Sequence, residues 1–262
     1  MDGVTLNDTA NQDCLQALLL TNPQDVKQEI EQSHSQNDRP SWLLDDNLTF
    51  LKWQHRVAHP VLWIHGMPSV STTLITTDIV NFLLSDDGQS PHTAVAYFFC
   101  GLVNSRQSPI VDMLRAILYQ VLRRQPTLFK HIRKTYDVHL EKLFTSVDAL
   151  QNLWSILCNM LNDKALNKAY IVIDGLEECD TDSLNLFLAL WRHTIGSSRP
   201  MMDHLLIHKW LFLTRDEHTL VPYLKKFPNI DLGERHLGLA STHEDHVLSK
   251  TNEAHSGKCL QF

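Results

Sequence analysis

Apolar residues recur along the chain in two patterns, short unbroken runs and longer stretches with helical spacing. The short runs predict buried strands at 61–65, 93–100, 169–173 and 209–213, with a last short strand at 229–232. The longer stretches predict helices at 13–20, 23–33, 42–53, 73–84, 109–124, 127–136, 147–161, 182–195 and 217–227. Strands that alternate with helices favour an α/β fold, a mostly parallel sheet covered by helices on both faces.

Polar segments divide the chain into three parts. We expect a helical lead and linker at 1–40, one α/β domain at 41–237, and a mobile polar tail at 238–262. The tail has few apolar residues and no helical or strand period, so truncation after Ala240 should leave thermal stability nearly unchanged.

Composition excludes several kinds of partner. The net charge is −7 and the chain has no block of basic residues, which argues against nucleic acid and against an anionic membrane surface. No apolar run approaches the ~18 residues that a membrane helix needs. The five cysteines form no C-x-x-C pair, which favours a reducing compartment, the cytoplasm or the nucleus, and we expect the cytoplasm. The histidines of the tail match no common closed four-ligand spacing, so we expect no zinc.

The first predicted strand runs into a small-residue turn and then a helix, the context of a phosphate-binding loop. Such a loop reads G-x-x-x-x-G-K-[ST], where the lysine reaches the outer phosphates and the hydroxyl holds Mg²⁺. Aligned on Gly66, this chain has Ser71, Thr72 and Thr73 in place of Gly, Lys and Thr. The hydroxyl is kept, but the fixed positive charge on the phosphates is lost. Ser69 and Ser71 also put side chains where the backbone approaches phosphate.

Two further polar stretches follow predicted strands. Asp174, Glu177 and Glu178 come after the strand at 169–173, and Arg215 follows the one at 209–213. Because ligands of parallel sheets sit at the carboxyl ends of strands, all three stretches are candidate site residues. Each has a simpler interpretation as well. Thr73 suits a helix N-terminus, Asp174 could cap the next helix, and Arg215 could pair with the acids that follow it.

An ordered set of short motifs gives these residues a family context. In chain order they are Pro23 to Ile30 before Ser41-Trp42-Leu43-Leu44-Asp45, Leu62-Trp63-Ile64-His65-Gly66-Met67-Pro68, Tyr97-Phe98-Phe99-Cys100, Leu114-Arg115-Ala116-Ile117-Leu118-Tyr119 with Gln125-Pro126, Ile171-Val172-Ile173-Asp174-Gly175-Leu176-Glu177-Glu178-Cys179-Asp180, and Lys209-Trp210-Leu211-Phe212-Leu213-Thr214-Arg215. The set resembles the NACHT-type P-loop NTPases of the STAND class, specifically the fungal NLR-like proteins with a nephrocystin-like NACHT domain. The resemblance spans residues 14–237.

The resemblance implies a role for each residue. Thr73 and Asp174 would hold Mg²⁺, and Glu177 and Glu178 would position or activate the attacking water. Arg215 would sense the terminal phosphate. The nucleotide would lie on the loop from Gly66 through Pro68, Ser71 and Thr72 to Thr73. ATP and Mg²⁺ are therefore the implied cofactors, but Thr72 in place of lysine argues against tight binding and against hydrolysis.

Three functions are consistent with these features. The leading hypothesis is a NACHT-like signalling or scaffold protein with impaired or lost ATP hydrolysis, hence a degenerate NTPase rather than an enzyme. The second is an ATP switch that works without the lysine and uses Thr73, Asp174 and a helix N-terminus. The third is an interaction-only fragment of a truncated receptor. In each case we expect a protein partner or self-association.

Overall fold

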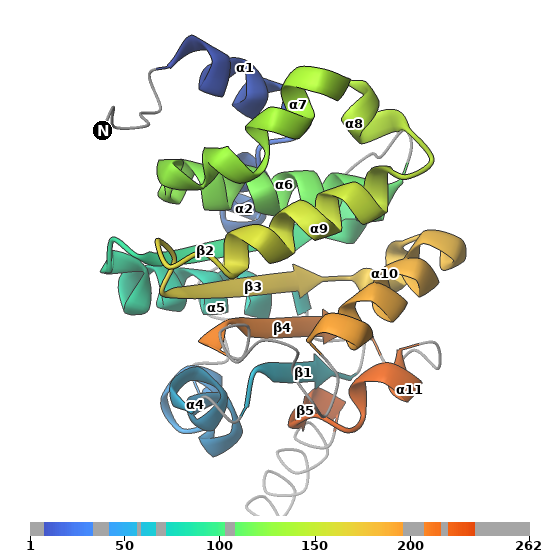
Figure 1. The fold of residues 1–262 in the computed structure, drawn as a ribbon. Helices are drawn as coiled ribbons and strands as arrows, with labels where there is room; N and C mark the ends of the chain where they lie inside the picture. Colours follow the sequence, from blue (N-terminus) through green and yellow to red (C-terminus); the bar gives the residue numbers. More distant parts are fainter. Residues whose placement is uncertain are drawn as a thin grey trace, which may run out of the picture.

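The sheet of this protein is entirely parallel. The computed structural model describes residues 8–33, 42–56, 59–66, 72–102, 108–195, 207–215 and 220–233. Its strands are β1 Val61–His65, β2 Thr93–Phe99, β3 Lys168–Asp174, β4 Lys209–Thr214 and β5 Asn229–Asp231. They lie side by side in the order β2-β3-β4-β1-β5 (Figure 1). The predicted parallel sheet of an α/β, P-loop-NTPase-like fold is confirmed.

Helices occupy most of the segments between the strands. They are α1 Thr9–Leu18, α2 Pro23–Ser33, α3 Trp42–Asp45, α4 Leu48–His55, α5 Thr72–Ser85, α6 Pro109–Arg124, α7 Arg133–His139, α8 Lys142–Thr145, α9 Ala149–Leu161, α10 Thr181–Thr194 and α11 Val221–Leu224. Short 3₁₀ helices lie at η2 Asp87–Gln89, η3 Cys100–Leu102, η4 Pro126–His131 and η5 Leu176–Glu178.

Both faces of the sheet are buried, so the strands read as continuous apolar runs. Successive side chains point to opposite faces, so Trp63 enters one core and its neighbour Ile64 enters the other. The first core is closed by α1, α6, α9 and α10, and the second by α2, α4 and α5. The two helices of the predicted N-terminal lead therefore pack on opposite faces.

Some predicted helix boundaries are wrong, and local hydrogen bonds explain why. The expected helix at 42–53 is two helices, because the Asn47 side chain accepts the N–H groups of Thr49 and Phe50 and starts a new one. The expected helix at 127–136 is η4 followed by α7. Helix α1 begins before residue 13 because the Asp8 carboxylate accepts the Ala10 N–H at 3.0 Å.

Several predictions fall on residues outside the described part of the chain. These are the roles of Pro68, Ser69 and Ser71 in the loop, the start of the helix at 217–227, and the tail at 238–262. Among the described helices, none is both long and apolar enough to cross a membrane.

Candidate functional site

The carboxyl ends of β1, β3 and β4 bring the three polar stretches of the sequence together at the carboxyl-terminal edge of the sheet, where its strands end. In the register of the parallel ladders, His65 of β1 lies opposite Thr214 of β4, and Asp174 of β3 lies opposite Leu213. Gly66, Asp174 and Arg215 therefore leave three adjacent strands at the same level. The predicted position of the site is where ligands bind in open parallel sheets.

Gly66 is required by the path of the chain out of β1. Its φ is +129°, a region that L side chains rarely adopt. A Cβ on this residue would lie 2.8 Å from the Gly233 nitrogen and 2.9 Å from Asp231 Oδ1. The backbone after β5 thus closes against the start of the loop, and the chain enters α5 at Thr72.

The hydroxyl of Thr73 and the carboxyl of Asp174 are in direct contact. Thr73, in the first turn of α5, hydrogen-bonds the Asp174 side chain. Thr76, one turn later, also contacts this carboxyl, while its own hydroxyl donates to the Thr72 carbonyl oxygen at 3.0 Å. Asp174 is only 4% exposed, and this burial raises the pKa of its carboxyl from 3.8 to about 7, against the opposing effect of the threonine hydrogen bonds. The pair offers the hard oxygen atoms that Mg²⁺ prefers.

The acidic pair after β3 faces Arg215. Glu177 accepts the Arg215 backbone N–H at 2.8 Å and lies 3.6 Å from its Nε, while the guanidinium forms an ion pair with Glu178. Within the described residues, the Oε2 atom of Glu177 is buried without a hydrogen-bond partner. Burial raises the pKa of Glu177. Arg215 therefore contacts both Glu177 and Glu178, so its partners include acids that precede it in the sequence and not only those that follow it.

A tight turn sets the position of the acidic pair. Gly175 has a φ of +76°, and the chain then forms η5 before Asp180 caps α10 by accepting the Ser183 N–H. Beside the turn, the thiols of Cys100 and Cys179 are hydrogen-bonded to each other, and both are buried. The hydrogen bond and burial raise the pKa of Cys100 well above its ordinary value.

Sequence reasoning missed two residues of this edge. Thr76 could have been found, because it lies three residues after Thr73 and therefore on the same side of the helix. His65 is less obvious. Its ring lies 4.0 Å from that of Trp63, and its Nδ1 atom is buried without a partner among the described residues. The indole of Trp63 in turn donates to the Thr214 hydroxyl at 2.7 Å.

Acidic groups outnumber basic ones at this edge, although within the described residues no three His, Cys, Asp or Glu side chains lie together as a metal-binding group. The described part of the site contains the carboxyl groups of Asp174, Glu177 and Glu178, that of Asp231 beside Gly66, and one guanidinium that already faces two of the acids. Thr72 begins α5 with a neutral hydroxyl where the loop's lysine belongs. The oxygen atoms of Thr73 and Asp174 fit Mg²⁺, whereas the β- and γ-phosphates would meet no side-chain cation other than Arg215 within the described residues.

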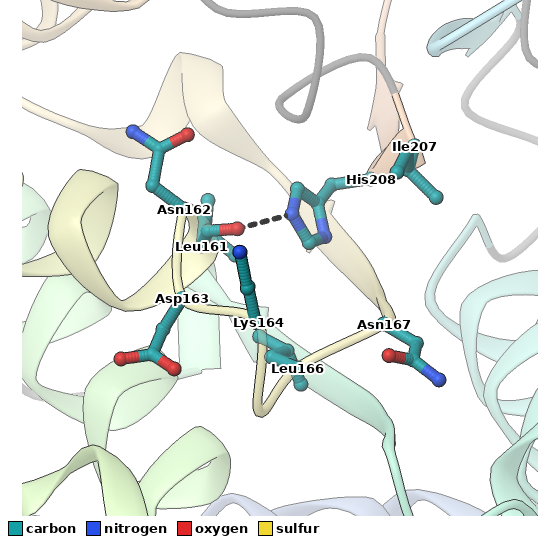
Figure 2. Close-up of a pocket in the computed structure, with 8 residues that line it drawn as sticks. All are labelled: Leu161, Asn162, Asp163, Lys164, Leu166, Asn167, Ile207 and His208. Carbon is teal, nitrogen blue, oxygen red and sulfur yellow. Dashed lines mark hydrogen bonds between the residues drawn. The ribbon is translucent and has the colours of Figure 1, made fainter.

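A second cavity lies at the amino-terminal edge of the sheet, where β3 and β4 begin. Its volume is about 260 Å³, and Asn162, Asp163, Asn167 and His208 are among its lining residues. Figure 2 shows His208 directed at the turn after α9, where its Nε2 atom is 2.6 Å from the Leu161 carbonyl oxygen. Because it borders the amino ends of the strands, this cavity is separate from the candidate site.

Comparison with known proteins places the chain in a family. Residues 39–208 match the family model described as nephrocystin 3, N-terminal. The chain is also 31% identical over 209 residues to the vegetative incompatibility protein HET-E-1 of Podospora anserina, a match that covers 78% of this chain and 14% of that protein. The chain thus spans only a small part of this relative.

Among solved structures, that of C. elegans PCH-2 is 10% identical and covers 61% of this chain and 43% of its own, with a TM-score of 0.24 that supports no argument. The family model and the curated relative confirm the resemblance carried by the motifs. The chain belongs to the nephrocystin 3 N-terminal family, a NACHT-type group with a P-loop-NTPase-like fold.

Proposed function

We propose that this chain is a NACHT-type signalling or scaffold protein in which ATP hydrolysis is impaired or lost. The observation that carries the proposal is a mismatch within one site. The acids that would serve Mg²⁺ and water are assembled around Asp174, while the position of the phosphate-binding lysine is Thr72. A bound ATP would therefore add roughly four negative charges to an edge of the sheet that is already acidic.

The retained residues have definite roles in this proposal. Thr73 and Asp174 would hold Mg²⁺, which supplies a positive charge that neutralises phosphate oxygens when bound. Glu177 and Glu178 would position or activate the attacking water, and the ion pair with Glu178 keeps Arg215 beside them. Without the lysine, these groups have no fixed partner on the β- and γ-phosphates, so turnover is slow or absent.

A working ATP switch is the second candidate. The close pairing of Thr73 with Asp174 favours it, because both residues would be used in Mg²⁺-nucleotide binding. An interaction-only role, in self-association or with a partner protein, is the third.

A calorimetric titration separates these candidates. MgATP, ATP with EDTA, and Mg²⁺ alone are titrated into the natural chain, and phosphate release is followed in parallel. The proposal expects weak Mg²⁺ binding, little or no heat from ATP, and no measurable turnover. Saturable, Mg²⁺-dependent ATP binding without turnover would favour the switch. Ordinary turnover would contradict the proposal and would show that Thr72 in place of lysine does not prevent hydrolysis.

A further inference from the structure

The outer edge of β2 is closed by side chains instead of by another strand. β2 is the last strand at one end of the sheet, with α6 packed beside it (Figure 1). The Gln120 side chain of α6 mimics a peptide group. Its Oε1 accepts the Tyr97 N–H at 3.2 Å, and its Nε2 donates to the Tyr97 carbonyl at 2.9 Å. Arg124 Nε donates to the Thr93 carbonyl at 3.0 Å. Such contacts protect an edge strand from further pairing.

The backbone groups of Val95 lie between these two contacts and, among the described residues, are left without a hydrogen bond on the outer side. Backbone groups of alternate residues in a strand point to the same side, so the N–H and C=O of Val95 face outward together with those of Thr93 and Tyr97. No described residue hydrogen-bonds these two groups of Val95 on that side. Val95 lines a cavity of about 420 Å³ between α2, the end of α5, β2 and α6, which we call the β2-edge cavity.

The β2-edge cavity is positively charged although the chain is acidic. Lys27 lines it but is neutralised by Glu31 at 3.1 Å. Within the described part of the chain, Arg124 hydrogen-bonds the carbonyl oxygens of Thr93, Gly88 and Ser90, which carry no full negative charge. Arg123 contacts the Tyr119 hydroxyl at 3.3 Å.

Neither guanidinium has a carboxylate partner among the described residues. Among the described residues, Glu31 and Asp25 are the acids that act electrostatically on Tyr97 in the cavity, and the hydrogen bond that Asp25 accepts from the Asn22 amide brings no opposite charge. Two unneutralised guanidinium groups therefore flank an unpaired stretch of strand edge.

We propose that the β2-edge cavity binds an extended acidic peptide segment of a partner protein. The peptide backbone would pair with the N–H and C=O of Val95 alone, because the Gln120 and Arg124 side chains occupy the strand edge at Tyr97 and Thr93. A carboxylate side chain of the peptide would lie against Arg123 and Arg124. A small anion would satisfy the guanidinium groups alone. The outward donor and acceptor of Val95 favour a ligand that has a backbone of its own.

The experiment uses a ¹⁵N-labelled sample of the full chain and a blocked five-residue peptide of alternating glutamate and valine. Its matched control is the same peptide with glutamine in place of glutamate. The glutamate peptide is expected to slow amide hydrogen exchange at Val95, and the glutamine peptide to bind roughly fivefold more weakly. Unchanged exchange at Val95 with a saturating glutamate peptide overturns the proposal.

Three variants make the test specific. Arg123→Gln should weaken peptide binding roughly fivefold, whereas Arg192→Gln, the same change on the exposed side of α10, should not alter it. Gln120→Ala should strengthen binding roughly tenfold, because it frees the N–H and C=O of Tyr97 for the peptide. If Gln120→Ala does not fold, the comparison of Arg123→Gln with Arg192→Gln and the amide exchange at Val95 still test the proposal. Citrate that binds as tightly as the peptide, without protection of Val95, indicates a small-anion site and overturns the proposal.

Discussion

Replacing Asp174 with asparagine should change how the stability of this protein depends on pH. Burial raises the pKa of Asp174 from 3.8 to about 7, so between these values the folded chain holds one proton more than the unfolded chain. Stability contributed by that proton is present below pH 3.8 and is lost as the pH rises to about 7. Over the full window the loss is about 4 kcal/mol, at ~1.4 kcal/mol per pH unit.

Asp174→Asn carries no titrating group and so escapes this loss. Between pH 5 and pH 8 the stability of the variant, relative to the natural chain, should increase by about 3 kcal/mol. Urea denaturation at pH 5, 6, 7 and 8 in EDTA measures it, since the chelator removes Mg²⁺ that would favour the ionised carboxylate. Two stability curves that stay parallel across this range would refute the assignment of a buried, neutralised carboxyl to Asp174.

Two other predictions test the opposite edge of the sheet and the loop. Burial lowers the pKa of His208 from 6.5 to about 4, so its contribution to stability is lost as the pH falls from 6.5 towards 4, a loss of about 3 kcal/mol. His208→Gln should remove this acid sensitivity in denaturation curves, and an unchanged pH profile would count against it. Gly66→Ala should destabilise the chain by about 2 kcal/mol or more, because of its positive φ and the Gly233 contact. A urea midpoint equal to that of the natural chain contradicts this strain.

The sheet could be predicted because its strands are buried on both faces. Runs such as 61–64 and 169–173 have no polar positions to confuse the pattern, and the carboxyl ends of these strands mark the site. Helix boundaries were harder to predict, because a single cap such as that of Asn47 ends one helix and starts another without interrupting the apolar spacing.

Contacts between distant residues could not be predicted at all. Lys209 begins β4 and is 2% exposed, and its Nζ atom donates to the carbonyl oxygens of Arg56 and His59, some 150 positions earlier. A strand pattern gives no reason to expect a buried ammonium group there. The unpartnered oxygen of Glu177 could not be predicted either. The motif indicates a role for this residue, but its burial depends on the contact with the Arg215 backbone, which is distant in the sequence.

The central claim is that the loss of the loop's lysine and glycines, rather than the loss of the acidic residues, limits nucleotide binding. The most direct measurement compares thermal stabilisation by millimolar MgATP in the natural chain and in the variant Ser69→Gly, Ser71→Gly, Thr72→Lys. The natural chain should gain almost nothing, and the triple variant should gain up to roughly 2.7 kcal/mol, as expected near 100 times the dissociation constant, with Thr72→Lys alone in between. Equal stabilisation of the natural chain and the triple variant would contradict the claim.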